Sequence, residues 1–246
     1  MTRTPGKPLR TSTTESDIWP KLSIEKQKLI FDELVEYVTQ LHSRIPSSNK
    51  IRNYKSNGQI GHDSNLQGPW NNYREFFYDQ LELKIKTLNE ENIFDPVRDD
   101  VMKSIKEFQK LNLPEFNDLP NVFTHYDLGL QNLTVNDNYK ITGIIDWEWA
   151  GSYPVSEEYF HSYKPIVYDN QLKNYLFDQL ENHTIPTPRT ISRFTLLQNL
   201  YDFLESIVPW YLTKVANPEH PIVEKKIFEN RDKVKTLVEQ IKQELN

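Results

Sequence analysis

Cysteine is absent from the 246 residues of the chain. This absence excludes disulfide bonds, zinc sites built on thiolates and cysteine nucleophiles. Long apolar runs are also absent, because no stretch approaches the roughly 18 apolar residues that span a membrane. The amino terminus lacks the apolar core of a secretory signal. We therefore expect a soluble, cytoplasmic protein that does not enter a membrane.

An excess of positive charge is missing as well, since the net charge is −6. The chain therefore has no general electrostatic attraction for nucleic acid or for an anionic membrane, whereas cationic small substrates are compatible with it. Hydrophobic residues make up 37% of the chain and charged residues 26%. This composition is typical of a soluble globular protein, and the length suffices for one domain with a sizeable core or two small ones.

Glycine is scarce, with 7 residues, and no glycine motif for phosphate binding is found. The only cluster, over residues 57–68, lacks the flanking strands that a glycine-rich phosphate loop requires. The Gly6-Lys7-Pro8 segment has neither the hydroxyl residue nor the preceding strand of a Walker motif. A strand lysine paired with a helix glutamate, which kinase-type sites also need, is not found either.

Hydrophobic periodicity predicts a mainly α (α+β) fold. Residues 1–17 have no apolar period and are expected to form a flexible tail, which leaves 18–246 as the folded domain. An amphipathic helix is predicted after Ser23, a suitable N-cap, and is stopped by Pro46. Residues 46–72 are expected to form a long loop. Further helical patterns cover 73–88, 97–111, 192–213 and 219–244, and they surround a β-hairpin formed by 132–135 and 140–145.

The chemically informative residues flank this hairpin. They form the pattern His125-x-Asp127-x-x-x-x-Asn132, followed by an apolar strand that ends at Asp146. Phosphoryl transfer needs a carboxylate that accepts or orients the attacking hydroxyl, and oxygen ligands for the magnesium that bridges the nucleotide phosphates. Asp127 and Asn132 share one short loop, so they can converge with Asp146 from two backbone segments. Such oxygen donors suit Mg²⁺.

At these residues the sequence resembles the aminoglycoside phosphotransferase and choline kinase family, relatives of the protein kinases. The resemblance is to its fungal branch and includes TPGKPL at 4–9, QLHSRIP at 40–46, GPWNNYREFFYDQL at 68–81 and IIDWEWAGSYP at 144–154. It implies a kinase-like C-terminal lobe, with ATP and Mg²⁺ as cofactors and a small hydroxyl-bearing substrate. It further implies that Asp127 is the catalytic base, that Asn132 and Asp146 bind magnesium and so the nucleotide, and that His125 braces the loop.

TPGKPL is similar to the segment that joins the two lobes in this family. The resemblance thus implies that residues 1–17 are a hinge remnant and that the N-terminal lobe is lacking. Three functions follow as alternatives. The first is an ATP- and Mg²⁺-dependent phosphotransferase acting on a small molecule. The second is a non-catalytic remnant, or a truncated gene model, that serves as a binding or interaction module. The third is a purely structural helical scaffold.

Two further groups of side chains have a structural interpretation beside a functional one. Packing is favoured over a role as a substrate platform for the aromatic residues Trp147, Trp149 and Tyr153. A solvated face or a helix start is favoured over attraction of a cationic substrate for the acidic residues Glu148, Glu157 and Glu158.

Overall fold

The computed structural model describes residues 5–10, 17–45, 52–53, 69–163, 170–213 and 221–246. Contacts divide the chain into two compact units. Unit 1 consists of 1–71 and 117–192, and unit 2 of 72–116 and 193–246. These boundaries do not coincide with the predicted division into a tail over 1–17 and one lobe over 18–246.

The longest helix of unit 1 is α1, Ile24–Arg44. Its N-cap is Ser23, whose side chain accepts a hydrogen bond from the backbone N–H of Lys26 (3.4 Å), as the sequence predicts. The apolar stripe is buried, with Ile30 and Leu34 fully inaccessible to solvent. Burying a side chain of this size contributes about 1.5–3 kcal/mol. The helix is thus held mainly by its apolar face.

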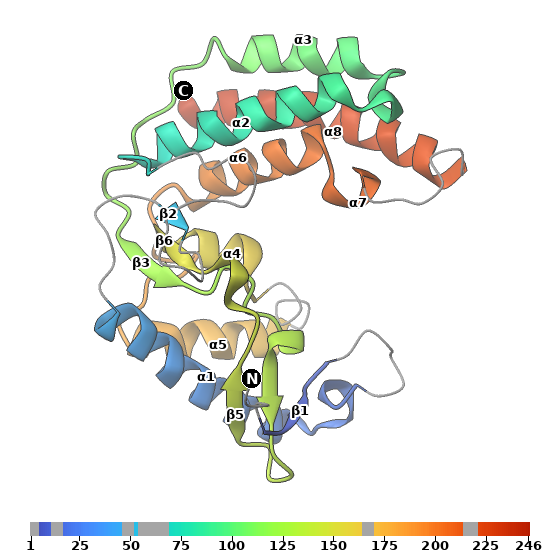
Figure 1. Cartoon of the computed structure of the whole chain (residues 1–246). Helices are drawn as coiled ribbons and strands as arrows, with labels where there is room; N and C mark the ends of the chain where they lie inside the picture. Colours follow the sequence, from blue (N-terminus) through green and yellow to red (C-terminus); the bar gives the residue numbers. More distant parts are fainter. Residues whose placement is uncertain (1–4, 11–16, 46–51, 54–68, 164–169, 214–220) are drawn as a thin grey trace. The chain divides into compact units, whose positions relative to one another are not determined.

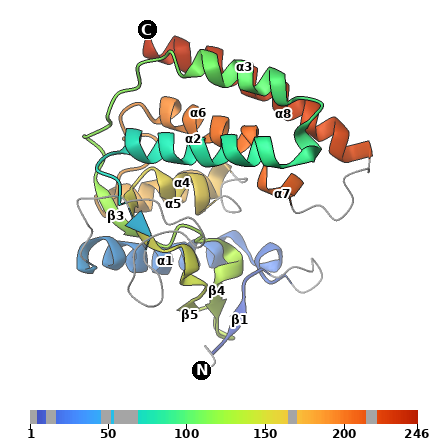
Figure 2. The same ribbon diagram turned by 45° about the horizontal axis from the view of Figure 1, so that its top comes forward.

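Helix α5, Asn170–Asn182, packs along α1, and the two lie side by side in Figures 1 and 2. The Tyr175 hydroxyl donates a hydrogen bond to Asp32 of α1 over 2.6 Å. Burial and this neighbouring carboxylate raise the pKa of Tyr175 to about 12. The described part of unit 1 also contains the short helix α4, Glu157–His161.

The predicted hairpin is confirmed and belongs to a three-stranded antiparallel sheet of order β1-β4-β5. Leu133 of β4 lies opposite Ile144 of β5. Lys7 of β1 lies opposite Val135 at the other edge of β4. The strands are β1 Lys7–Pro8, β4 Leu133–Val135 and β5 Ile141–Ile144.

Strand β1 shows that residues 5–10 belong to the fold, although the sequence analysis places them in a flexible tail. The backbone N–H of Leu9 donates to the carbonyl of Leu133 (3.0 Å), and the Leu9 side chain is fully buried. Two residues of strand are too short to show periodicity, which explains why the sequence pattern missed them. Residues 1–4 and 11–16 lie outside the described part of the chain.

A second antiparallel sheet, of order β2-β6-β3, was not predicted. Its central strand β6 is buried at every position, so it lacks the alternation of a half-exposed strand. Its edge strand β2 lies within the range predicted to be a long loop, of which 46–51 and 54–68 are outside the described residues. The strands are β2 Arg52–Asn53, β6 Gly151–Pro154 and β3 Asn121–Thr124.

Unit 2 is helical in its described residues. Helix α8 packs on α6 and on α3, and α2 packs on α6 (Figures 1 and 2). At the centre, the rings of Phe108 and Phe203 stack with centroids 4.5 Å apart. The helices are α2 Tyr73–Glu90, α3 Arg98–Phe108, α6 Phe194–Ile207, α7 Trp210–Thr213 and α8 Pro221–Leu245.

The helices of unit 2 match the predicted patterns with one difference. The pattern over 192–213 is divided into α6 and α7, because the chain leaves the helical conformation at Val208 before Pro209. The residue before a proline disfavours the α region. None of the helices in the described ranges combines the length and apolar character needed to cross a bilayer. Helices around small antiparallel sheets confirm the expected mainly α fold class.

Candidate functional site

The loop that follows β3 begins with His125, whose side chain is fully buried. Its Nε2 lies 2.8 Å from the carbonyl oxygen of Ile145, and its Nδ1 lies 3.3 Å from the backbone nitrogen of Asp127. A carbonyl oxygen can only accept, so Nε2 carries the proton and Nδ1 accepts from the Asp127 N–H. His125 therefore ties the loop to the end of β5, which is the bracing that the family resemblance implies.

Asp127 and Asn132 meet within this loop. The Asn132 amide nitrogen donates to the Asp127 carboxylate (3.1 Å) and to the Asp127 backbone carbonyl (2.7 Å). A short turn over Leu130–Asn132 brings the two residues together, and Asn132 is itself buried. The backbone N–H of Ile145 donates to the Asn132 carbonyl (3.0 Å), which fixes the loop a second time against the end of β5.

Asp146 lies two residues beyond the end of β5. Its backbone is left-handed, with φ 66° and ψ 59°, and its side chain is exposed. Burial raises the pKa of the Asp127 carboxyl above its ordinary value, and the nearby negative charge of Asp146 adds to this rise. The hydrogen bond from Asn132 opposes it. Asp127 and Asn132 thus meet within one loop, and two hydrogen bonds of Ile145, the residue before Asp146, hold the end of β5 against that loop.

The donor set suits magnesium. The Asn132 amide nitrogen is engaged by Asp127, which leaves the amide oxygen as the atom of Asn132 suited to a metal. Across the described ranges, no three His, Asp or Glu side chains form a group that could hold a metal by themselves. Mg²⁺ does not need such a cage, since it binds through one or two carboxylates together with phosphates and water. Asp146 and Asn132 are the residues that could hold such an ion.

The chain matches the model of a known protein family. The family model described as the phosphotransferase enzyme family, APH, matches residues 1–180. The chain belongs to the phosphotransferase enzyme family. No match was found among curated proteins.

Solved structures of phosphotransferases share the fold of this family member. ADP-bound aminoglycoside phosphotransferase APH(2'')-Ib is 13% identical, with a TM-score of 0.54, and the match covers 90% of this chain and 68% of that one. The streptomycin-ATP-APH(2'')-IIa ternary complex is also 13% identical, with a TM-score of 0.57 over 89% of this chain and 67% of that one. Macrolide 2'-phosphotransferase type I is 11% identical, with a TM-score of 0.52 over 95% and 67%. These similarities confirm the kinase-like fold.

Two of the aromatic residues near the loop 125–132, Trp147 and Tyr153, pack against neighbouring groups, as the sequence analysis favoured. Tyr153 is buried on β6, and the Trp147 ring lies against His125 with centroids 4.5 Å apart. The Trp147 indole N–H donates to the carbonyl of Ile144 (2.8 Å). Trp147 also borders a cavity of about 410 Å³ between the end of α1 and β5, whose other lining residues include Leu41 and Arg44. Trp149 is half-buried.

The acidic residues divide into two groups. Glu148 is exposed, whereas Glu157 and Glu158 start helix α4, as predicted, but are buried, with 2% and 3% of their surface accessible. The expected solvated face is therefore wrong for these two. His161 lies 3.4 Å from Glu157, and His42 lies 3.8 Å from Glu158. His42 lies 116 residues before Glu158 in the sequence, which explains why no local pattern indicated this pairing.

The loop 125–132 also makes a set of contacts that the sequence did not indicate. The Leu128 N–H donates to the Ser162 hydroxyl (2.9 Å), and the Tyr163 N–H donates to the Leu128 carbonyl (3.0 Å). The Tyr126 hydroxyl donates to Glu157 (3.2 Å). The segment 157–163 therefore supports the residues on both sides of Asp127. No short motif joins these residues, since they are 31–35 positions apart in the chain.

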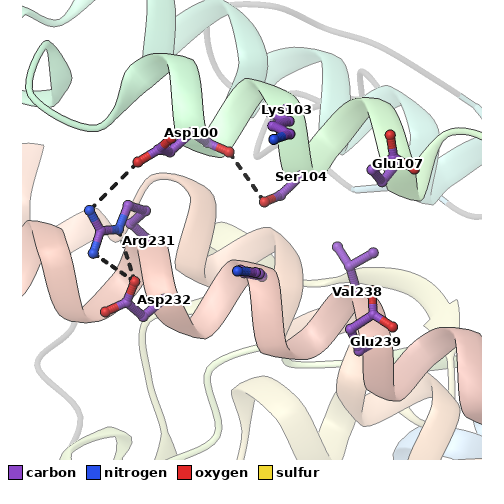
Figure 3. A pocket seen from close by; sticks show the side chains of 9 residues that line it. Asp100, Lys103, Ser104, Glu107, Arg231, Asp232, Val238 and Glu239 are labelled. Carbon is purple, nitrogen blue, oxygen red and sulfur yellow. Dashed lines mark hydrogen bonds and ion pairs between the residues drawn. The ribbon is translucent and has the colours of Figure 1, made fainter.

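Figure 3 shows a further cavity of about 320 Å³, formed by α3 and α8 of unit 2. Arg231 of α8 pairs with Asp100 of α3 (3.6 Å) and with its neighbour Asp232 (2.8 Å). Since charges of both signs line this cavity, it does not favour a ligand of one charge. None of the predicted site residues contributes to it. Its remaining charged lining residues are Lys103, Glu107, Lys235 and Glu239.

Proposed function

We propose that this phosphotransferase-family protein transfers the γ-phosphoryl group of ATP to a hydroxyl of a small molecule, in a magnesium-dependent reaction. The observation that carries the proposal is the arrangement of Asp127, Asn132 and Asp146. Asn132 orients the Asp127 carboxylate through a hydrogen bond, and Ile145, which directly precedes Asp146, is hydrogen-bonded to Asn132 and to His125 of the same loop.

In the proposed reaction Asp127 acts as the base. Its ionised carboxylate accepts the proton of the substrate hydroxyl while that oxygen forms a bond to the γ-phosphorus. The bond between the γ-phosphorus and the bridging oxygen breaks, and ADP leaves with that electron pair. A pKa above the ordinary value makes Asp127 a somewhat stronger base, provided that it stays ionised at the working pH.

Asn132 and Asp146 are proposed to hold Mg²⁺. The positive charge of such an ion would neutralise charge that develops on the nucleotide phosphates. His125 holds the two proposed magnesium ligands in position, because it joins the loop that contains Asn132 to the residue before Asp146. Its buried ring is proposed to hold the loop in place.

The substrate class and the location of the protein are also proposed. A cationic substrate is compatible with the net charge of −6. The related folds include proteins named for aminoglycoside and macrolide phosphotransfer, which supports a small hydroxyl-bearing acceptor. The cytoplasmic location and the membership of a fungal branch stay predictions from the sequence.

A binding module without catalysis is the alternative, in which the same residues bind MgATP but no transfer follows. The sequence contains no glycine-rich phosphate loop, which motivates this alternative, because such a loop supplies further contacts to the phosphates. The two functions differ in one measurable respect, which is turnover in the presence of bound nucleotide.

The test is Asp127→Ala, assayed for ADP release with MgATP and a panel of small hydroxyl compounds. We expect the rate to fall by about 10²- to 10⁴-fold, the usual contribution of a positioned acid or base. Asp137→Ala, an exposed aspartate in the β4–β5 turn, is the matched control and should keep full activity. Unchanged turnover in Asp127→Ala would refute the role of the base.

Nucleotide binding is measured separately by thermal unfolding with MgATP. A ligand that binds only the folded protein at 100 times its dissociation constant stabilises it by about 2.7 kcal/mol. A shift without turnover in the wild-type protein would select the binding module. The absence of both a shift and turnover would overturn both functions and favour a structural scaffold.

A further inference from the structure

Tyr126, which directly precedes Asp127, has a left-handed backbone with φ 69°. For a residue as bulky as tyrosine this region is rarely occupied, because the β-carbon crowds the backbone. Such a conformation costs on the order of 1–3 kcal/mol and persists only where surrounding contacts enforce it. Glycine would adopt this φ without strain. The tyrosine is therefore explained by what its side chain does.

The Tyr126 side chain is held by three groups. Its ring stacks on His161, with centroids 4.0 Å apart and planes at 22°. The same ring contacts Tyr153 of β6, with centroids 4.3 Å apart. Its hydroxyl donates to the buried carboxylate of Glu157 (3.2 Å). One stacked ring, one tilted ring and a hydrogen bond hold the Tyr126 ring in one orientation, and this restrains the backbone that carries it.

Leu128, on the other side of Asp127, is held by the same segment of chain. Its N–H donates to Ser162 and its carbonyl accepts from Tyr163. Asp127 is thus the middle residue of a three-residue stretch whose two neighbours are both attached to 157–163. A rotation of the backbone at Tyr126 would move the Asp127 carboxylate away from the Asn132 amide, which lies 3.1 Å from it.

We propose that Tyr126 is a positioning residue for phosphoryl transfer, which sets the direction of the Asp127 carboxylate through its contacts with Glu157, His161 and Tyr153. The proposal rests on the proposed function, because it assigns Tyr126 a role only through Asp127. Tyr126 touches neither substrate nor nucleotide in this role. Its effect belongs to the rate of the chemical step, since small displacements of a catalytic group strongly lower that rate.

Two variants separate the contributions of the hydroxyl and the ring. Tyr126→Phe removes the hydrogen bond to Glu157 and keeps the stacking. Tyr126→Gly removes both and also relieves the strained φ. We expect kcat for ADP release to fall roughly 3- to 10-fold in Tyr126→Phe and roughly 10- to 100-fold in Tyr126→Gly, the latter comparable to a displacement of about 1 Å. The KM for MgATP should change less than about twofold, because the proposed magnesium ligands are untouched.

The matched control is Tyr159→Phe. This tyrosine belongs to α4, and its hydroxyl donates to the carbonyl of Pro186 (2.6 Å) rather than to the loop. The substitution removes a hydroxyl from the same segment, 157–163, so it should lower the melting temperature but leave kcat unchanged. A purely structural role for Tyr126 would give the same result in Tyr126→Phe as in Tyr159→Phe.

The assay uses the full chain with MgATP and the most active acceptor of the panel, or with water as acceptor when none is found. Wild-type turnover with unchanged kcat in both Tyr126 variants would overturn the positioning role alone. Equal losses of kcat in Tyr126→Phe and Tyr159→Phe would also overturn it, since they would reflect general loosening of α4. A wild-type protein without MgATP-dependent turnover would overturn the proposed function, and the role of Tyr126 with it.

Discussion

The proposed reaction needs Asp127 in its ionised form, but this form lowers the stability of the fold. Burial and the charge of Asp146 raise its pKa in the folded protein. The folded state therefore binds the proton more tightly than the unfolded state does. The stabilisation that follows from this tighter proton binding is fully present below the ordinary aspartate pKa of 3.8. It is lost as the pH rises through the pKa that Asp127 has in the folded protein. At neutral pH the ionised carboxylate destabilises the fold.

Asp127→Asn should consequently raise the melting temperature at neutral pH, because the neutral amide carries no charge and can still accept the bond from Asn132. The difference from the wild-type protein should shrink as the pH falls toward 3.8. Thermal unfolding across this range measures it. Asp137→Asn, at an exposed site, is expected to change nothing. A variant less stable than wild type at neutral pH would contradict the expectation.

At the scale of single residues, the sequence indicated the loop that contains Asp127 and Asn132 but not the contacts of this loop with 157–163. The spacing from His125 to Asn132 indicated one loop, and the structure joins Asp127 and Asn132 by a hydrogen bond. The chemistry of phosphoryl transfer is concentrated in a few residue types at short spacing, so a pattern can reveal it. Tyr126 and Glu157 form a contact between distant segments. No local periodicity reports such a contact.

At the scale of elements, strand β1 depends on Gly6. This glycine has φ 110°, and a β-carbon there would lie 2.7 Å from the carbonyl oxygen of Val135 and closer still to the Thr142 hydroxyl. Both neighbours belong to the hairpin on which β1 pairs. The approach of the two backbones therefore leaves no room for a side chain at this position.

Gly6→Ala should detach β1 and expose Leu9, which is fully buried. Strain and lost burial together are expected to destabilise the protein by about 2–5 kcal/mol, as truncation of a core leucine does. Urea unfolding measures this change. Lys7→Ala is the control on the same strand, because its pair with Asp137 is exposed on both sides and contributes little. Equal stability of the two variants would show that β1 contributes nothing to the fold.

The elements that the sequence predicted are those with a long one-sided apolar pattern, such as α1 and α2. The hairpin was also found, because β-like runs flank an Asn/Asp turn. Strand β6 was missed since glycine and proline stand at its ends and all of its residues are buried, so its composition resembles a turn. The break between α6 and α7 was missed because apolar residues continue through it.

At the scale of the whole molecule, the proposed site and the segment 157–163 that contacts it lie within one unit. Asp127, Asn132, Asp146 and Tyr126 all belong to unit 1, whereas unit 2 has its own aromatic core around Phe108 and Phe203. The chain passes between the units at 71–72, 116–117 and 192–193. Unit 2 is therefore made of two separate chain segments. The order of residues along the chain does not indicate that these segments pack together.

Damage to the core of unit 2 should lower stability without changing nucleotide affinity. Phe203→Leu removes the stack on Phe108 and is expected to destabilise the protein by on the order of 1–3 kcal/mol. The dissociation constant for MgATP, measured by calorimetry well below the melting temperature, should equal that of the wild-type protein, because every proposed ligand lies in unit 1. A weaker affinity in folded Phe203→Leu would mean that packing in unit 2 sets the geometry of Asn132 or Asp146. The site would then depend on both units.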